Sequence, residues 1–220
     1  MDKQRDELTI LGTLCAEQGI KMLPFMVEQL VRYRDYLEHW NRKINLISRK
    51  EDAPVIIKHI FHSLLITLHH SFLEGEKNLD LGTGGGLPGI PLAILNPHTN
   101  FILIDATGKK VEACRDMIKQ LGLNNAVAIH TRAEEMKGVV FDTVLSRQVA
   151  PLDMLCNWAG RLLKPKGVLI CLKGGNLESE IAKALETSKE HRNFPAEIEL
   201  HPIQEVNPYF TEKQIVVARG

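Results

Sequence analysis

A glycine-rich loop between two acidic residues carries the strongest chemical signal in the sequence. Gly82, Gly84 and Gly86 stand at alternate positions shortly after Asp80, which belongs to a short apolar run. Glycines with this spacing let the backbone turn sharply and approach a ligand without any Cβ in the way. A helix that starts near Leu87 would direct the free N–H groups of its first turn at the same ligand. The pattern predicts a loop that holds a nucleotide.

The two acidic residues narrow the choice of nucleotide. The carboxylate of Asp80 would repel a pyrophosphate but attract an ammonium group, such as that of S-adenosylmethionine. Asp105 lies 23 residues beyond Gly82, at the end of the next apolar run, where an acidic side chain can bind both ribose hydroxyls. We therefore predict that Asp80, Gly84 and Asp105 contact the cofactor. The loop also matches the dinucleotide fingerprint G-x-G-x-x-G when the count starts at Gly84, so a nicotinamide-dependent oxidoreductase is an alternative.

The elements that must position these residues change character along the chain. Residues 1–75 show helical periodicity, which predicts an N-terminal helical cap. In residues 76–220, strands alternate with helices, which is typical of a parallel sheet covered on both faces. We expect parallel strands at 78–81, 100–104, 126–130, 141–146 and 167–171, and a hairpin at 196–202 and 214–218 that gives an antiparallel last strand. The predicted fold class is α/β, with a mostly parallel sheet, an antiparallel last strand and an N-terminal helical cap.

The residues that follow these strands are the candidates for chemistry, because ligands of open α/β sheets bind beyond the carboxyl ends of the strands. Asp105 follows the second strand. Ala133 and Glu134 follow the third, where their backbone amides could read an adenine edge. Arg147 ends the fourth strand, beside the position where a transferred methyl group would emerge, and we interpret it as functional. The edge lacks an Asn/Asp-Pro-Pro-aromatic motif for exocyclic amines and a cysteine nucleophile for pyrimidine C5.

Composition limits the class of protein and its partners. The 220 residues are 44% hydrophobic and 25% charged, and 27 basic residues balance 27 acidic ones, so no overall field attracts a polyanion. The four cysteines and the histidines from His39 to His70 lack the spacing of a metal site, and we expect buried free thiols and no metal. No signal region begins the chain, and no run approaches the roughly 20 apolar residues of a membrane span. We expect a cytoplasmic monomer with no membrane partner.

Basic residues gather in the segment 39–50, between two of the expected N-terminal helices. Arg42, Lys43, Arg49 and Lys50 stand there near Trp40, with no acidic residue among them. This composition fits an RNA-facing patch. It also fits a solvated loop above a packed tryptophan, which composition alone favours. Both interpretations stay open on the residues alone.

Six motifs, in order along nearly the whole chain, resemble those of the bacterial 16S ribosomal RNA methyltransferase G family, also called glucose-inhibited division protein B. They are Asn41 to Leu46, Lys58 to Leu64, Asp80 to Pro91, Gly108 to Val111, Arg132 to Glu135, and Ser146-Arg147 with Ala150 to Leu152. One position departs from the pattern. The family commonly has Asp directly before the Ser-Leu of the second motif, where this chain has His62.

The resemblance implies a Rossmann-like S-adenosylmethionine-dependent methyltransferase that methylates N7 of one guanine in 16S rRNA, with the small ribosomal subunit as its partner. By position it implies that Gly82 and Leu87 line the methionine side of the cofactor, that Ala133 and Glu134 contact the adenosine, and that Arg147 closes the site near the methyl group. Guanine N7 loses no proton on methylation, so no general base is required. A small-molecule methyltransferase and a non-catalytic RNA-binding factor are the alternatives.

Overall fold

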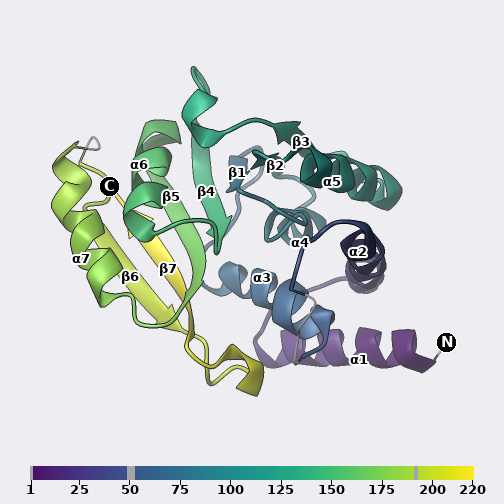
Figure 1. Cartoon of the computed structure of the whole chain (residues 1–220). Helices are drawn as coiled ribbons and strands as arrows, with labels where there is room; N and C mark the ends of the chain where they lie inside the picture. The colour runs from purple at the N-terminus through teal and green to yellow at the C-terminus, as the bar shows by residue number, and fades with distance from the viewer. Residues whose placement is uncertain (1, 49–52, 191–192) are drawn as a thin grey trace.

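The computed structural model describes residues 2–48, 53–190 and 193–220 and shows a twisted sheet between layers of helices (Figure 1). Seven strands form the sheet in the order β3-β2-β1-β4-β5-β7-β6. The pairs from β3 to β5 are parallel, whereas β7 is antiparallel to both β5 and β6. The strands are β1 Lys77–Leu81, β2 Asn100–Asp105, β3 Ala126–His130, β4 Phe141–Arg147, β5 Leu163–Gly174, β6 Glu197–Pro202 and β7 Lys213–Arg219. The predicted fold class, with its antiparallel last strand, is confirmed.

Helices cover both faces of this sheet (Figure 1). They are α1 Asp2–Glu17, α2 Pro24–Lys43, η1 Ile56–Phe61, α3 His62–Leu64, η2 Leu65–Leu68, α4 Gly89–Leu95, α5 Gly108–Leu121, η3 Ala133–Glu135, α6 Leu152–Leu162, α7 Glu178–Thr187, η4 Ser188–Glu190 and η5 Pro208–Phe210. Successive residues of β4 point to opposite cores: Leu145 packs in the core with α2, α4 and α5, and Val144 packs in the core with α6 and α7. The strand β4 is therefore buried on both faces of the sheet.

The N-terminal helices pack into the first of these cores. Leu37 of α2 belongs to the same cluster of buried side chains as Leu103 of β2. A buried ion pair between Arg34 of α2 and Glu7 of α1 joins the two helices. Among the described residues before β1, every regular element is a helix, and these helices share one hydrophobic core with the sheet. Residues 56–68 do not form one regular helix, because a π-helical turn, one α-helical turn and one 3-10 turn follow one another there.

Outside the sheet edge, the described residues include buried thiols but no cluster of metal-ligating side chains. All four cysteines are buried free thiols, as the sequence predicts. Among the described residues, no group of three His, Cys, Asp or Glu side chains could hold a metal ion. Within the same ranges, no helix combines the length and the apolar character that crossing a membrane requires.

Candidate active site

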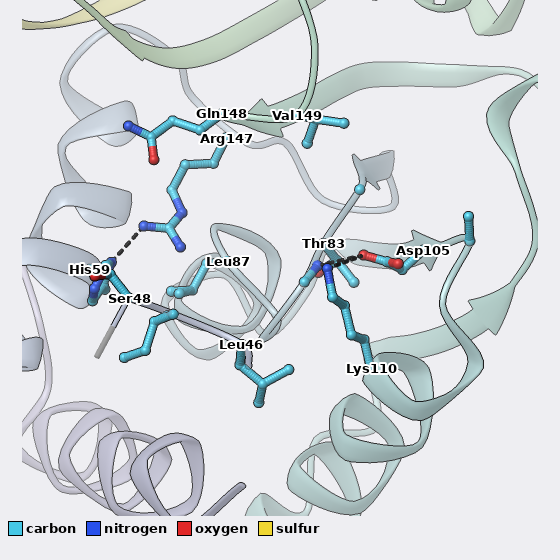
Figure 2. A pocket seen from close by; sticks show the side chains of 14 residues that line it. Leu46, Ser48, His59, Thr83, Leu87, Asp105, Lys110, Arg147, Gln148 and Val149 are labelled. Atoms are coloured by element: carbon cyan, nitrogen blue, oxygen red, sulfur yellow. Dashed lines mark hydrogen bonds and ion pairs between the residues drawn. The ribbon is translucent and has the colours of Figure 1, made fainter. Parts of the chain in front are cut away.

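A cavity of about 450 Å³ lies at the carboxyl edge of the sheet, at the ends of β1, β2 and β4 (Figure 2). Its volume is in the range of small-ligand sites. Five segments of the chain line it, with the residues Leu46, Ile47, Ser48, His59, Gly82, Thr83, Gly84, Leu87, Asp105, Ala106, Lys110, Arg147, Gln148 and Val149. The structure thus brings together five of the predicted site residues, namely Gly82, Gly84, Leu87, Asp105 and Arg147.

The glycine loop gives the cavity a surface without side chains. Gly82 and Gly84 have φ angles of +70° and +57°, a region that side-chain-bearing residues adopt only with strain. A Cβ added to Gly82 would lie 2.5 Å from Cγ2 of Val149, which lines the same cavity. The loop therefore depends on glycine here both for its backbone conformation and for the space that a side chain would fill.

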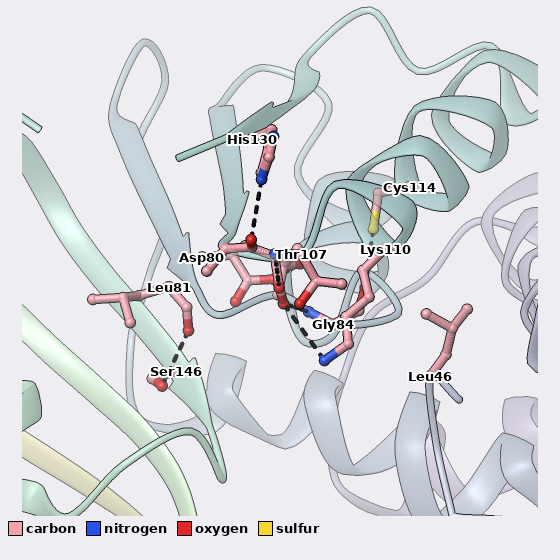
Figure 3. Close-up of polar contacts among 12 residues, drawn as sticks. Leu46, Asp80, Leu81, Gly84, Thr107, Lys110, Cys114, His130 and Ser146 are labelled. Carbon is pink, nitrogen blue, oxygen red and sulfur yellow. Dashed lines mark hydrogen bonds and ion pairs between the residues drawn. The ribbon is translucent and has the colours of Figure 1, made fainter. Parts of the chain in front are cut away.

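Asp105, at the end of β2, lies beside this loop and is held by two backbone N–H groups. Its Oδ2 accepts a hydrogen bond from the N–H of Gly84 at 3.1 Å, and its Oδ1 accepts one from the N–H of Thr107 at 2.8 Å. Figure 3 labels the two donor residues, Gly84 and Thr107. The Nζ atom of Lys110 is 3.9 Å from Oδ2. Each carboxylate oxygen can accept a second hydrogen bond, so the fixed carboxylate suits the two hydroxyls of a ribose. These donors and acceptors, together with the bare loop, fit S-adenosylmethionine.

Asp80 lies beneath the loop and does not line the cavity. Its carboxylate is fully buried, and Oδ2 accepts hydrogen bonds from Oγ1 of Thr83 at 2.5 Å and from the N–H of Gly89 at 2.9 Å. Burial raises the pKa of Asp80 to about 6, although these two hydrogen bonds act against the increase. The helix expected to start near Leu87 is α4, which begins two residues later, at Gly89. Its first N–H group is directed at Asp80, which does not line the cavity.

Arg147 extends from the end of β4 into the cavity and meets a histidine that the sequence did not single out. Its Nη1 atom is 2.6 Å from Nδ1 of His59, on η1 (Figure 2). Burial, together with the charge of Arg147, lowers the pKa of His59 to about 3. The ring is therefore neutral near pH 7, and its Nδ1 can accept a hydrogen bond from the guanidinium group. The sequence shows only that His59 lacks the spacing of a metal ligand, and the fold shows that it lines the cavity.

The remaining predicted residues lie apart from the cavity. Ala133 and Glu134 form η3 after β3, with Ala133 buried and Glu134 exposed, and neither lines the cavity. Arg42 and Lys43 are exposed in the last turn of α2, where Nζ of Lys43 lies 5.0 Å from the centre of the Trp40 ring. The predicted RNA contacts Arg49 and Lys50 lie outside the described residues.

His62, the position that departs from the family's second motif, is buried in the core. Its ring centre is 5.0 Å from that of Phe210, and its Nε2 atom has no hydrogen-bond partner among the described residues. Burial lowers the pKa of His62 to about 3, and the charges of Arg147 and Lys213 act in the same direction. The unfolded chain therefore binds a proton between pH 6.5 and pH 3 that the native state does not bind. Because the unfolded state is favoured by this extra proton, the free energy of unfolding decreases as the pH falls through this range.

Replacing His62 with Leu is expected to make the protein less sensitive to acid. In wild type, the free energy of unfolding loses about 2 kcal/mol through His62 between pH 7.5 and pH 5, and the variant lacks this loss. Urea unfolding of both proteins at the two pH values measures the difference. His39→Leu, which removes an exposed ring, is the control and should leave the wild-type difference in place. Equal losses in wild type and His62→Leu would contradict the burial argument.

The order of the strands, the glycine loop and the acidic residue at the end of β2 define a Rossmann-like S-adenosylmethionine-dependent methyltransferase. The sequence matches the rRNA small subunit methyltransferase G family over residues 26–203. The chain belongs to this family. It is 65% identical over 220 residues to the ribosomal RNA small subunit methyltransferase G of Pelodictyon phaeoclathratiforme, a match that covers 100% of this chain and 96% of that protein.

Solved structures support the fold. TYW2 of M. jannaschii in complex with AdoMet is similar with a TM-score of 0.60 and 17% identity, over 81% of this chain and 78% of that chain. The precorrin-6y C5,15-methyltransferase of Geobacter metallireducens is similar with a TM-score of 0.54 and 14% identity, over 82% of this chain and 95% of that chain.

Membership of this family makes the chain a methyltransferase, so the oxidoreductase interpretation of the glycine fingerprint is wrong. The structure gives another reason for the third glycine of that fingerprint. A Cβ added to Gly89 would lie 2.7 Å from Oδ2 of Asp80 and 2.9 Å from Cγ of Leu103. Glycine is thus required at this position for the close packing of α4 on the strands.

Proposed function

We propose that the protein transfers the methyl group of S-adenosylmethionine to N7 of a guanine in 16S rRNA. One observation carries the proposal: in a chain of the rRNA small subunit methyltransferase G family, the glycine loop, Asp105 and Arg147 line a single cavity. In open α/β sheets, this edge is where the ligand binds.

The cavity residues divide into a cofactor side and an acceptor side in this proposal. Gly82, Gly84 and Leu87 hold the methionine part of the cofactor, and Asp105 accepts hydrogen bonds from the ribose. Asp80 acts from beneath, because its hydrogen bonds to Thr83 and Gly89 fix the shape of the loop. The contact of Ala133 and Glu134 with the adenosine stays a prediction.

The reaction requires positioning more than proton transfer. The bound cofactor supplies a methyl group on a positively charged sulfur atom. Guanine N7 presents a lone pair and has no proton to lose, so the protein needs no general base. The guanidinium of Arg147, held against the neutral ring of His59, is suited to orienting the acceptor. Correct orientation of two reactants can contribute roughly 7 to 11 kcal/mol of the barrier reduction.

The exposed end of α2 is the proposed RNA-facing part of the molecule. Arg42 and Lys43 are both solvent-exposed there, directly before the stretch that lines the cavity. Basic side chains of this kind bind the phosphates of a nucleic acid without reading its sequence. We propose that they hold the rRNA while Arg147 acts on the target base.

Transfer of a labelled methyl group tests the proposal. Small ribosomal subunits that lack the modification are incubated with the full chain and S-adenosylmethionine labelled in its methyl group. Label is expected in 16S rRNA. Chemical cleavage of the RNA at N7-methylguanine should then cut the strand at one guanine and so locate the methylated base. Subunits that already carry the modification are the control and should take up no label.

Two outcomes would change the assignment. Absence of label on both subunits and naked rRNA, with S-adenosylhomocysteine still bound by the protein, would support a small-molecule acceptor. Absence of cofactor binding by the wild-type chain would overturn the assignment of the cavity itself.

A further inference from the structure

The stretch that follows α2 forms one wall of the cavity without belonging to a helix or a strand. Leu46, Ile47 and Ser48 all line the cavity, and Leu46 and Ile47 are buried. Figure 2 shows Leu46 and Ser48 near Leu87 of the glycine loop. Because this stretch is irregular, its backbone N–H groups have no ladder partners and need other acceptors.

One side chain supplies an acceptor to two of these groups. Oδ1 of Asn41 accepts hydrogen bonds from the N–H of Leu46 at 2.8 Å and from the N–H of Ile47 at 3.0 Å. Both bonds use the two lone pairs of a single amide oxygen. Asn41 stands in the last turn of α2, so the wall is tied to the helix that precedes it.

The helix α2 is in turn hydrogen-bonded to the glycine loop and to α5. The hydroxyl of Tyr33 donates a hydrogen bond to the carbonyl oxygen of Gly85 in the glycine loop at 2.8 Å. Nε1 of Trp40 donates one to Oδ2 of Asp116, on α5, at 2.8 Å. A Cβ added to Gly85 would lie 3.3 Å from Cβ of Leu46. The wall thus packs directly on the loop, and Asn41 holds it from a rigid base.

We propose that Asn41 is a positioning residue that holds residues 46–48 against the glycine loop and so completes the cofactor cavity. The inference rests on the proposed function, because it takes the cavity as the site of S-adenosylmethionine. Its consequence is a link between substrate and cofactor. Arg42 and Lys43 follow Asn41 directly in the same turn of α2. RNA bound to these two basic residues would therefore lie next to Asn41, the residue that supports the cavity wall.

A series of substitutions at Asn41 tests the role. Asn41→Ala removes the acceptor and leaves two N–H groups without it, and the dissociation constant for S-adenosylhomocysteine is expected to increase about tenfold. The KM for S-adenosylmethionine should increase by a similar factor, while kcat at saturating cofactor stays close to wild type, because Asn41 does not touch the reacting atoms. Asn41→Asp keeps an acceptor oxygen in place and is expected to bind within about threefold of wild type.

Further variants separate positioning from general destabilisation. Asn41→Gln keeps an amide and suits a helix, so we expect it to fold. It moves the oxygen by one methylene, and it should therefore weaken binding as Ala does. Asn125→Ala is the matched control, because the Asn125 side chain also ties a loop, through the carbonyls of Ala93, Asn96 and Thr99, and lies outside the cavity. It should lower thermal stability and leave the dissociation constant unchanged.

The outcomes distinguish the inference from the proposed function. Calorimetric titration of the full chain with S-adenosylhomocysteine supports the inference if Ala and Gln weaken binding while Asp and the Asn125 variant do not. Wild-type affinity in Asn41→Ala or Asn41→Gln would overturn the inference and leave the proposed function in place. If the wild-type chain itself does not bind S-adenosylhomocysteine, the proposed function fails first.

Discussion

Gly82→Asp is expected to remove measurable binding of S-adenosylhomocysteine and, with it, methyl transfer. At φ +70° any side chain strains the backbone, and a Cβ would lie 2.5 Å from Cγ2 of Val149. The new carboxylate would also add a negative charge to a cavity that already contains Asp105. A strained loop, a filled cavity and a second charge together correspond to at least about a 100-fold loss of affinity, or roughly 3 kcal/mol. Calorimetric titration measures it.

The structure offers a matched control for this substitution. Gly122 has a φ angle of +67°, no atom lies within 4 Å of its added Cβ, and it caps the end of α5 outside the cavity. Gly122→Asp therefore carries similar backbone strain without filling the site. It should lower the thermal stability through this strain and bind S-adenosylhomocysteine as wild type does. Equal affinity of the two variants would mean that Gly82 acts on stability and not on the cavity.

The framework of the fold could be predicted because local patterns and burial agree. The run from Phe101 to Ile104 is apolar without alternation, and β2 is a strand covered on both faces. The glycines of the loop indicate a backbone conformation that other residues avoid, and Gly82, Gly84 and Gly86 all have positive φ. Residues 56–68 lie in the segment with helical periodicity, but the chain forms a series of short helical turns of different kinds there instead of one regular helix.

The cavity itself could be predicted only in part, because some of its lining residues are brought there by contacts between distant parts of the chain. Asp105 was found from its position at a strand end. His59 lies 88 residues from its partner Arg147 in the sequence, and no local pattern connects the two. Leu46 carries no functional group, so its place in the cavity wall follows only from the packing of α2 on the glycine loop. The sequence also cannot distinguish a carboxylate beneath a loop from one above it, and Asp80 is beneath.

Arg147→Ala is expected to lower kcat/KM for methylation of small subunits by roughly 100-fold, because loss of correct orientation of the reactants costs about this much. The guanidinium group lines the cavity and is fixed by Nδ1 of His59 at 2.6 Å. Its forked donors can hold a base or a phosphate in one orientation. Alanine leaves the cofactor loop and Asp105 in place, so binding of S-adenosylhomocysteine should fall much less than the rate. Arg115→Ala, which removes an arginine that bonds the carbonyl of Ala128 outside the cavity, is the control and should stay within about twofold of wild type.

The pH dependence separates positioning from proton transfer. Burial is the main reason that the pKa of His59 is near 3. Removing the charge of Arg147 relieves only the smaller contribution, so the ring remains neutral from pH 6 to pH 9. Guanine N7 has no proton to lose, so neither protein needs a base in this range. The rate profiles of wild type and Arg147→Ala, measured with labelled cofactor, should therefore run parallel. A new inflection in the variant would show that Arg147 controls a proton in the reaction, and a rate within threefold of wild type would show that the cavity orients its acceptor without it.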